Sequence, residues 1–173
     1  MRAKQVPKPA SRPFQLSLHI RHPALDPQEI SQTLQLQAGE CFKAGAPRDS
    51  QPGARPTSVH RETYWAAELQ TSLTDPIVGV LSASEAAALR RRFGGEEANT
   101  GLMASLDVAL SVTSLRFMAA HRDFLERIQR EGGTVRILVT IAPSELKGFT
   151  LVPEVSRLLA ALGIIVEFEF IDS

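Results

Sequence analysis

Apolar and polar residues alternate along several segments of the chain, a pattern typical of a strand with one buried face. In the first of these segments, Phe14, Leu16, Leu18 and Ile20 alternate with polar residues, and Pro23 ends it. We therefore predict a strand here and similar strands over residues 135–141 and 164–171. Two further strands are predicted over residues 36–43, with a break near Gly39, and over residues 60–69.

Helical periodicity and helix-ending residues predict the helices. Asp26 is a suitable N-cap in front of Pro27, so a short helix is expected from Asp26 to about Leu34. Another is expected over residues 84–93, and a final one begins at Pro153.

The longest periodic segment, residues 102–131, allows two interpretations at its start. Residues 106–112 alternate like a strand, so only residues 114–130 are predicted as helix without ambiguity. Pairs of glycines follow this segment and residues 84–93, and Gly163 follows the final helix. Because these glycines come after helices and match no phosphate-loop motif, we interpret them as helix stops.

This order of elements predicts an α+β fold. We expect a two-layer sandwich, with a mainly antiparallel sheet and helices on one face, ferredoxin-like in character. The first and last strands are expected to be neighbours. His19 and Arg21 would then lie opposite Glu167 and Glu169 on the exposed face, and opposite charges favour such pairing modestly.

Length and composition favour one globular domain. The chain has 173 residues, of which 43% are hydrophobic, which is enough for a single core. We divide it into a flexible basic tail, residues 1–12, and a single domain, residues 13–173. No apolar run approaches the roughly 20 residues that cross a bilayer, and prolines stand where a secretory signal would be apolar. A cytoplasmic protein is therefore expected, with no membrane partner.

Charge is balanced in sum but not along the chain. The 19 basic and 19 acidic residues cancel, yet residues 1–61 carry a net +5 and residues 62–173 a net −5. Either a basic tail and loop simply precede acidic helices, or a dipolar surface attracts a charged partner. Nucleic-acid binding is disfavoured, because aromatic residues make up only 6% of the chain and do not alternate with basic ones.

Catalytic and metal-binding motifs are not evident, and no cofactor is predicted. Cys41 is the single cysteine, which excludes an internal disulfide and a multi-cysteine zinc site. A Cys41–His60 nucleophile pair and a metal site of His19, His22 and His60 are both conceivable, but no motif completes either. His121, on the apolar face of the long helix, is expected to be a hydrogen-bonded structural histidine.

The loop over residues 43–61 is the most informative candidate for binding. It is long, rich in proline and glycine, and basic, and it leads into Tyr64 and Trp65. Long loops without regular structure are often functional, although this one is equally compatible with an inert insertion. Trp65 is compatible with an interface anchor or with a plug in the core. The candidate binding residues are Lys43, Arg48, Arg55, His60, Arg61, Tyr64 and Trp65.

Several short motifs in combination resemble a known bacterial family. They are Leu16-Ser-Leu-His-Ile20, Leu25-Asp-Pro-Gln-Glu-Ile30, Lys43-Ala-Gly-Ala-Pro-Arg48 and Thr63-Tyr-Trp65, followed by the closing helix and strand. Over residues 14–170 the chain resembles the uncharacterised family catalogued as domain of unknown function 4279. Residues 76–113 are longer than is usual there, and the ending Ile171-Asp172-Ser173 replaces a more acidic and aromatic one. The resemblance implies a fold and a bacterial source, but no chemistry.

Three hypotheses for function follow. The first is a noncatalytic binding or interaction protein of immunity or regulatory type, with a protein partner. The second is a domain that binds a small anionic ligand through the basic loop. The third, least favoured, is an enzyme that uses Cys41 or the histidines.

The second hypothesis makes a direct prediction. Replacing Arg48, Arg55 and Arg61 with alanine should weaken binding of an anion or an acidic partner while the fold stays intact, because surface charges steer such binding. The measurement is affinity as a function of salt concentration. An affinity that responds to salt in the same way in the triple variant would contradict the prediction.

Overall fold

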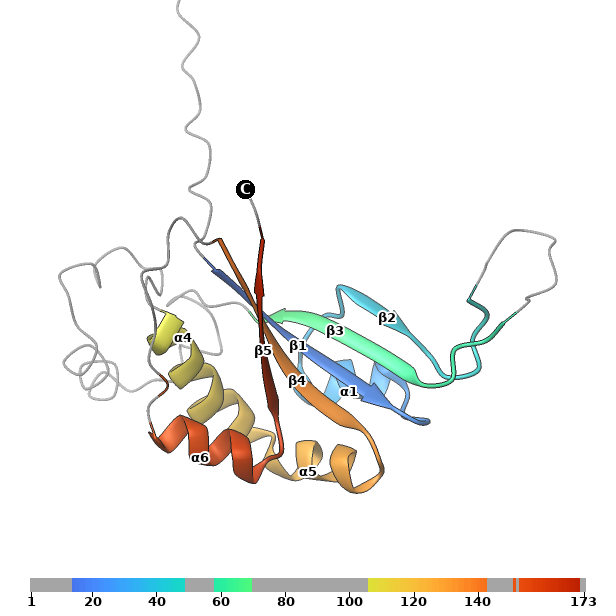
Figure 1. The fold of residues 1–173 in the computed structure, drawn as a ribbon. Coiled ribbons are helices and arrows are strands. Elements are labelled where there is room, and N and C mark those ends of the chain that lie inside the picture. The colour runs from blue at the N-terminus through green and yellow to red at the C-terminus, as the bar shows by residue number, and fades with distance from the viewer. Residues whose placement is uncertain (1–13, 49–57, 70–105, 143–150, 152, 172–173) are drawn as a thin grey trace, which may run out of the picture.

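A computed structural model describes residues 14–48, 58–69, 106–142, 151 and 153–171, which form an α+β fold with one mixed sheet (Figure 1). The strands are β1 (Phe14–His22), β2 (Glu40–Phe42), β3 (Thr63–Leu69), β4 (Thr134–Ile141) and β5 (Ile165–Phe170). The helices are α1 (Pro27–Leu34), α4 (Leu106–Val112), η2 (Thr113–Met118), α5 (Arg122–Arg130) and α6 (Pro153–Ala161). The strand order is β2-β3-β1-β4-β5, antiparallel except for the parallel pair β4–β5.

The ends of the short elements follow local sequence chemistry. The Asp26 carboxylate accepts a hydrogen bond from the Gln28 backbone amide at 2.9 Å and caps α1, as the sequence predicts. At the end of α6, Gly163 adopts a φ of +56°, and the Ile164 amide donates to the Leu159 carbonyl at 2.9 Å. This left-handed turn favours glycine and leads the chain directly into β5.

The ambiguous segment 106–112 is helical. Leu106, Ala109 and Leu110 are all buried, which is the i, i+3, i+4 spacing of a helix face and not the spacing of a strand. The helical segment continues as the π-helical η2 and then as α5 after a break near His121. The long periodic segment is therefore three helical pieces in series.

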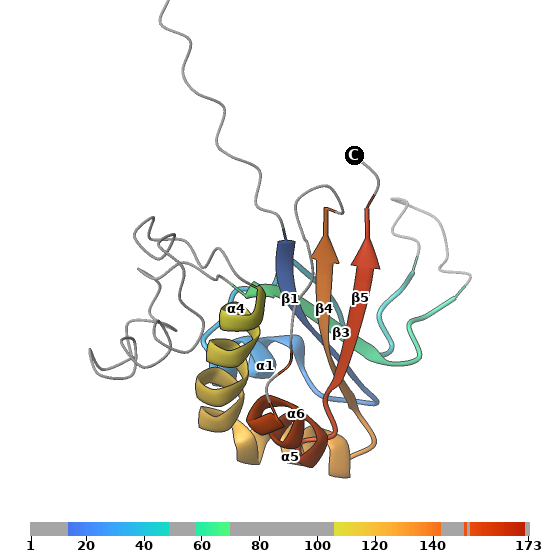
Figure 2. The same cartoon turned by 60° about the vertical axis from the view of Figure 1, so that its left-hand side comes forward.

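The helices lie on one side of the sheet, so the described chain forms two layers (Figures 1 and 2). The sheet side of the core comes from alternate residues of the strands, such as Leu18 in β1 and Ile137 in β4, which are both fully buried. Trp65 of β3 is also fully buried, and its indole donates a hydrogen bond to the Ser31 hydroxyl of α1 at 2.9 Å. This contact joins the two layers.

The expectation that the first and last strands are neighbours is wrong. β4 lies between them and pairs with β1 on one side and β5 on the other. The face assignment behind the expectation still holds, because alternation places the glutamates of β5 on the same face as His19 and Arg21. Glu167 forms its ion pair with Arg136 of the adjacent strand β4, and not with a residue of β1.

Other sequence expectations have more limited outcomes. The strand expected over residues 36–43 is only three residues long, and the one expected over 60–69 begins at Thr63. The tail, residues 1–12, and the helix expected over residues 84–93 lie outside the described residues. Within the described part of the chain, no helix combines the length and the apolar character that crossing a membrane requires.

The two-layer core predicts a sharp contrast between two isoleucines. Ile137 is fully buried at the centre of the sheet, whereas Ile165 is 47% exposed on its edge. Ile137→Ala should lower the free energy of unfolding by about 2–5 kcal/mol, because it leaves a cavity. Ile165→Ala should lower the free energy of unfolding much less, by about 1 kcal/mol or less. Urea denaturation of both variants is the measurement, and equal losses would contradict the layer assignment.

Candidate functional site

The side of the sheet opposite the helices carries a cluster of charged and aromatic side chains, which we call the open face. Strand register places His19 beside Ala66 of β3 and Arg136 of β4, and Arg21 beside Tyr64 and Thr134. The open face comprises Glu40, Phe42, Tyr64, Ala66, Glu68, Gln15, Ser17, His19, Arg21, Thr134, Arg136, Leu138, Thr140, Ile165, Glu167 and Glu169. Five strands thus contribute to one surface.

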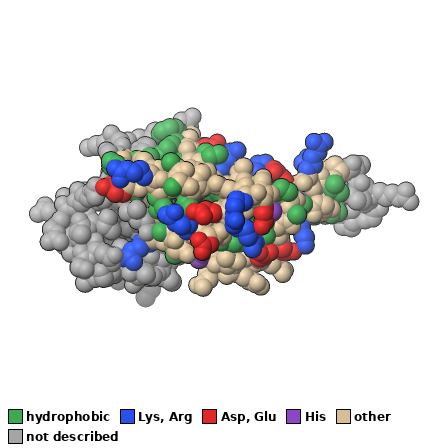
Figure 3. Space-filling view, turned by 90° about the horizontal axis from the view of Figure 1, so that it is seen from below, with side chains coloured by type: hydrophobic (Ala, Val, Ile, Leu, Met, Phe, Trp, Pro, Cys, Tyr) green, Lys and Arg blue, Asp and Glu red, His purple; other side chains and the backbone are tan. Residues whose placement is uncertain are grey.

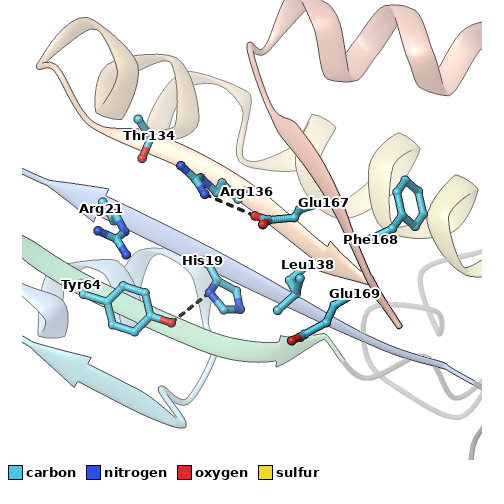
Figure 4. Close-up of a pocket in the computed structure, with 9 residues that line it drawn as sticks. All are labelled: His19, Arg21, Tyr64, Thr134, Arg136, Leu138, Glu167, Phe168 and Glu169. Atoms are coloured by element: carbon cyan, nitrogen blue, oxygen red, sulfur yellow. Dashed lines mark hydrogen bonds and ion pairs between the residues drawn. The ribbon is translucent and has the colours of Figure 1, made fainter. Parts of the chain in front are cut away.

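His19 lies at the centre of the open face, and both of its ring nitrogens are within hydrogen-bond distance of a hydroxyl. Its Nδ1 lies 2.9 Å from the Tyr64 hydroxyl and its Nε2 lies 2.9 Å from the Ser17 hydroxyl. The residue of β3 directly opposite His19 is the small Ala66. The Tyr64 side chain, two residues away on the same strand, extends toward the His19 ring (Figure 4). The imidazole is therefore fixed in position by two neighbours.

Burial and charge set the protonation of this centre. Partial burial lowers the pKa of His19, and the nearby carboxylates of Glu167 and Glu40 oppose this shift only in part. Burial also raises the pKa of the Tyr64 phenol, with Glu40 adding to the shift. Near neutral pH the pair is therefore a neutral imidazole beside a neutral phenol.

A row of stacked rings leads from the basic loop to this centre. The His60 ring stacks on Phe42 with a centroid separation of 3.7 Å, and Phe42 stacks on Tyr64 at 5.1 Å. The Arg21 guanidinium lies over the Tyr64 ring at 5.6 Å from its centroid and forms an ion pair with Glu62 at 2.7 Å. His60 and Tyr64, both candidates from sequence, therefore belong to one continuous surface.

The other half of the open face is an ion pair at the sheet edge. Arg136 Nη1 lies 3.3 Å from the Glu167 carboxylate, and Glu169 follows two residues later on the same face of β5 (Figure 4). Between these strands and β1 lies a hollow of about 370 Å³, with Leu138 among its apolar lining residues. The lining of the hollow combines both signs of charge with a few apolar side chains.

The basic loop is less cationic in the structure than its sequence indicates. The Lys43 ammonium pairs with Asp26 at 2.6 Å, and this hydrogen bond holds the pKa of the Asp26 carboxyl below its usual range. Arg48 and Arg61 are both exposed. A Pro47–Val59 bridge joins the two described parts of this loop. Arg55 lies outside the described residues.

Trp65 is not part of any surface. Its full burial and its hydrogen bond to Ser31 give it the role of a core plug, one of the two roles that the sequence left open. Strand alternation explains this difference from Tyr64, because adjacent residues of β3 face opposite sides of the sheet.

The nucleophile and metal hypotheses find no support in the geometry of the described residues. Cys41 faces α1, whereas its neighbour Phe42 and the His60 ring stacked on it lie on the open face. His22 is buried on the helix side, where its Nδ1 accepts hydrogen bonds from the backbone amides of Ala24 and Leu25. In the part of the chain that the structure describes, no three His, Cys, Asp or Glu side chains are grouped as a metal site would require.

Sequence reasoning did not find Arg136, Leu138 or the central position of His19. Alternation in residues 135–141 indicated which residues face away from the core, but not which strands flank this one.

His121 lies outside the open face. It packs its ring against Phe117 at 4.7 Å between centroids, and burial lowers its pKa.

Comparisons with protein-family models, with curated proteins and with solved structures find no match to this chain. The geometry of the open face is therefore the basis for assigning a function.

The lowered pKa of His19 predicts how stability changes with pH. An unfolded histidine takes up its proton at about pH 6.5, before the folded His19 does, so the native state should lose stability as pH falls from this value toward the folded pKa. His19→Gln should remove part of this loss, while the part due to His121 remains. Urea titrations at several pH values measure the free energy of unfolding of both proteins. If the wild type became more stable relative to the variant as pH falls, the prediction would be contradicted.

Proposed function

We propose that the protein is a noncatalytic binding domain whose partner docks on the open face. One observation carries the proposal: the helices cover one side of the sheet, and the other side holds a hollow lined by His19, Tyr64, Arg136 and Glu167. A solvated sheet face usually carries scattered polar residues. Here, hydrogen bonds, stacking and ion pairs hold side chains from five strands in a fixed arrangement, which favours recognition without reordering.

The charge of the open face supports a protein partner more than a small anion. Its two arginines both form ion pairs, and it carries the four carboxylates Glu40, Glu68, Glu167 and Glu169. An anion would have to displace a carboxylate from an arginine and then remain near the others. A protein surface that carries both basic and acidic groups can instead match both signs of charge.

The contact between Ser17 and His19 has the spacing of a nucleophile and a general base, yet it supports catalysis poorly. β1 is a central strand whose backbone pairs with β3 and β4 on its two sides. Its amides are therefore engaged in the sheet and do not form an oxyanion hole. The lowered pKa of His19 also makes the imidazole a weaker base.

The test exchanges charges without removing an ion pair. Arg136→Glu combined with Glu167→Arg keeps a pair on the open face but reverses its direction. The matched control exchanges Arg122 and Glu126, an exposed pair on α5. We expect both proteins to keep the wild-type melting temperature, since surface pairs contribute about 1 kcal/mol or less.

The readout is quantitative capture from a lysate of the source cell. Proteins retained by the wild type and by the α5 control should be lost from the open-face variant. Equal retention by all three proteins would contradict docking on this face. Covalent labelling of Ser17 by a fluorophosphonate, absent in Ser17→Ala, would contradict the noncatalytic assignment.

A further inference from the structure

We propose that the outer edge of β5 is a second docking site, which accepts an extended segment of a partner protein with basic residues at alternate positions. The site is the backbone edge of the sheet and shares only Glu167 and Glu169 with the open face, so strand pairing at this edge does not depend on the proposed function. It rests on the position of β5, on the exposed apolar side chains along it and on the charges that β5 presents.

The first observation is the unequal length of the two sheet edges. β2, at one edge, is three residues long, and the chain that follows it folds back through the Pro47–Val59 bridge. β5, at the other edge, is six residues long and pairs with β4 alone among the strands that the structure describes. Long edge strands are templates for further strand pairing unless they are blocked.

The backbone of β5 is oriented for such pairing. The Ile171 amide donates to the Ile141 carbonyl of β4 at 3.0 Å. Because successive residues of a strand direct their backbone groups to opposite sides, Glu167 and Glu169 share this direction. The amides of Val166 and Phe170 therefore point away from β4, toward the outer edge.

Exposed apolar side chains are concentrated at this edge. Within the described residues, four large hydrophobic side chains are strongly exposed, and three of them lie on β5 or next to it. These three are Ile165 at 47%, Phe170 at 63% and Ile171 at 49% exposed. An additional strand would cover part of this surface, on both faces of the sheet, and burial of apolar area favours its binding.

Charge distinguishes a basic segment from a second copy of this chain. Glu167 and Glu169 lie on the same face of β5, two residues apart. If two β5 strands paired antiparallel about their centres, every register would place one of these glutamates directly opposite another, which is destabilising. Lysine or arginine at alternate positions of a partner strand would instead face both carboxylates, with apolar residues between them on the helix side.

The experiment uses a fluorescently labelled, end-blocked peptide of alternating lysine and valine, and an otherwise equal peptide of alternating glutamate and valine. Binding to the full chain is followed by fluorescence anisotropy at low salt. We expect the lysine peptide to bind at least tenfold more tightly than the glutamate peptide. Equal affinities, or no binding of the lysine peptide, would overturn the proposal.

Two variants of Phe170 separate the strand edge from its side chain. Phe170→Pro removes an outward amide that does not bond to β4, a change that edge strands tolerate, and Phe170→Ala keeps this amide. Phe170→Pro should weaken lysine-peptide binding at least tenfold more than Phe170→Ala does. Equal losses would overturn the proposal, because the side chain and not the backbone edge would then carry the binding.

A charge variant tests the choice of partner independently of proline. Glu169→Lys should lower the preference for the lysine peptide over the glutamate peptide at least fivefold, and an unchanged preference would overturn the proposal. Sedimentation equilibrium gives a further outcome. A wild-type dimer that Phe170→Pro dissociates would identify a second copy as the occupant and would also overturn it. Neither Phe170 variant changes a side chain of the open face, so the two docking proposals can fail separately.

Discussion

The register between β1 and its two neighbours is the constraint on which the rest of the structure depends. Leu18 is opposite Ala67 on one side and Ile137 on the other, and all three face the helices. A one-residue shift of β1 would send Leu18 into solvent and bring His19 into the core, and the same shift of β4 would exchange Ile137 and Arg136. Burial of the apolar set therefore fixes the polar set as well, although the two sets do not touch. The same free energy that forms the core also assembles the open face.

The sequence predicted most of the elements but not their order in the sheet. Alternation and capping are local signals, so the strand of Phe14–His22 and the helix capped by Asp26 could be recognised from a few residues each. Strand order depends on the path of the chain between elements. The connection from β4 through α6 places β5 parallel to β4, and this arrangement leaves no room for the expected contact with β1. Opposite charges on the first and last strands do not determine which strands are neighbours, because any exposed sheet face offers several such pairings and each contributes little free energy.

The candidate site was only half accessible to sequence reasoning for the same physical reason. His60 and Tyr64 were found because they lie near each other along the chain beside a distinctive loop. Glu167 was expected on the face of His19, but as a residue of a neighbouring strand. Arg136 is an ordinary charged residue in a strand, and only the sheet brings it between them. The loop illustrates the opposite error. Its positive charge was counted residue by residue, whereas Asp26, distant in sequence, neutralises Lys43. On the described part of the face seen in Figure 3, acidic and basic side chains are also interspersed and not segregated.

The central position of β1 also has a consequence for how the protein is made. β1 is an inner strand of the sheet, and its partners β3 and β4 are synthesised after it because they lie later in the chain. During synthesis the edge of β1 that pairs with β4 remains open until β4 emerges, and closing so large a loop of chain is slow compared with forming a hairpin. A strand with apolar residues and an open edge is a template for misassembly during this interval. The polar residues that alternate along β1 limit that risk, so the residues that define the open face of the finished protein also protect the nascent one.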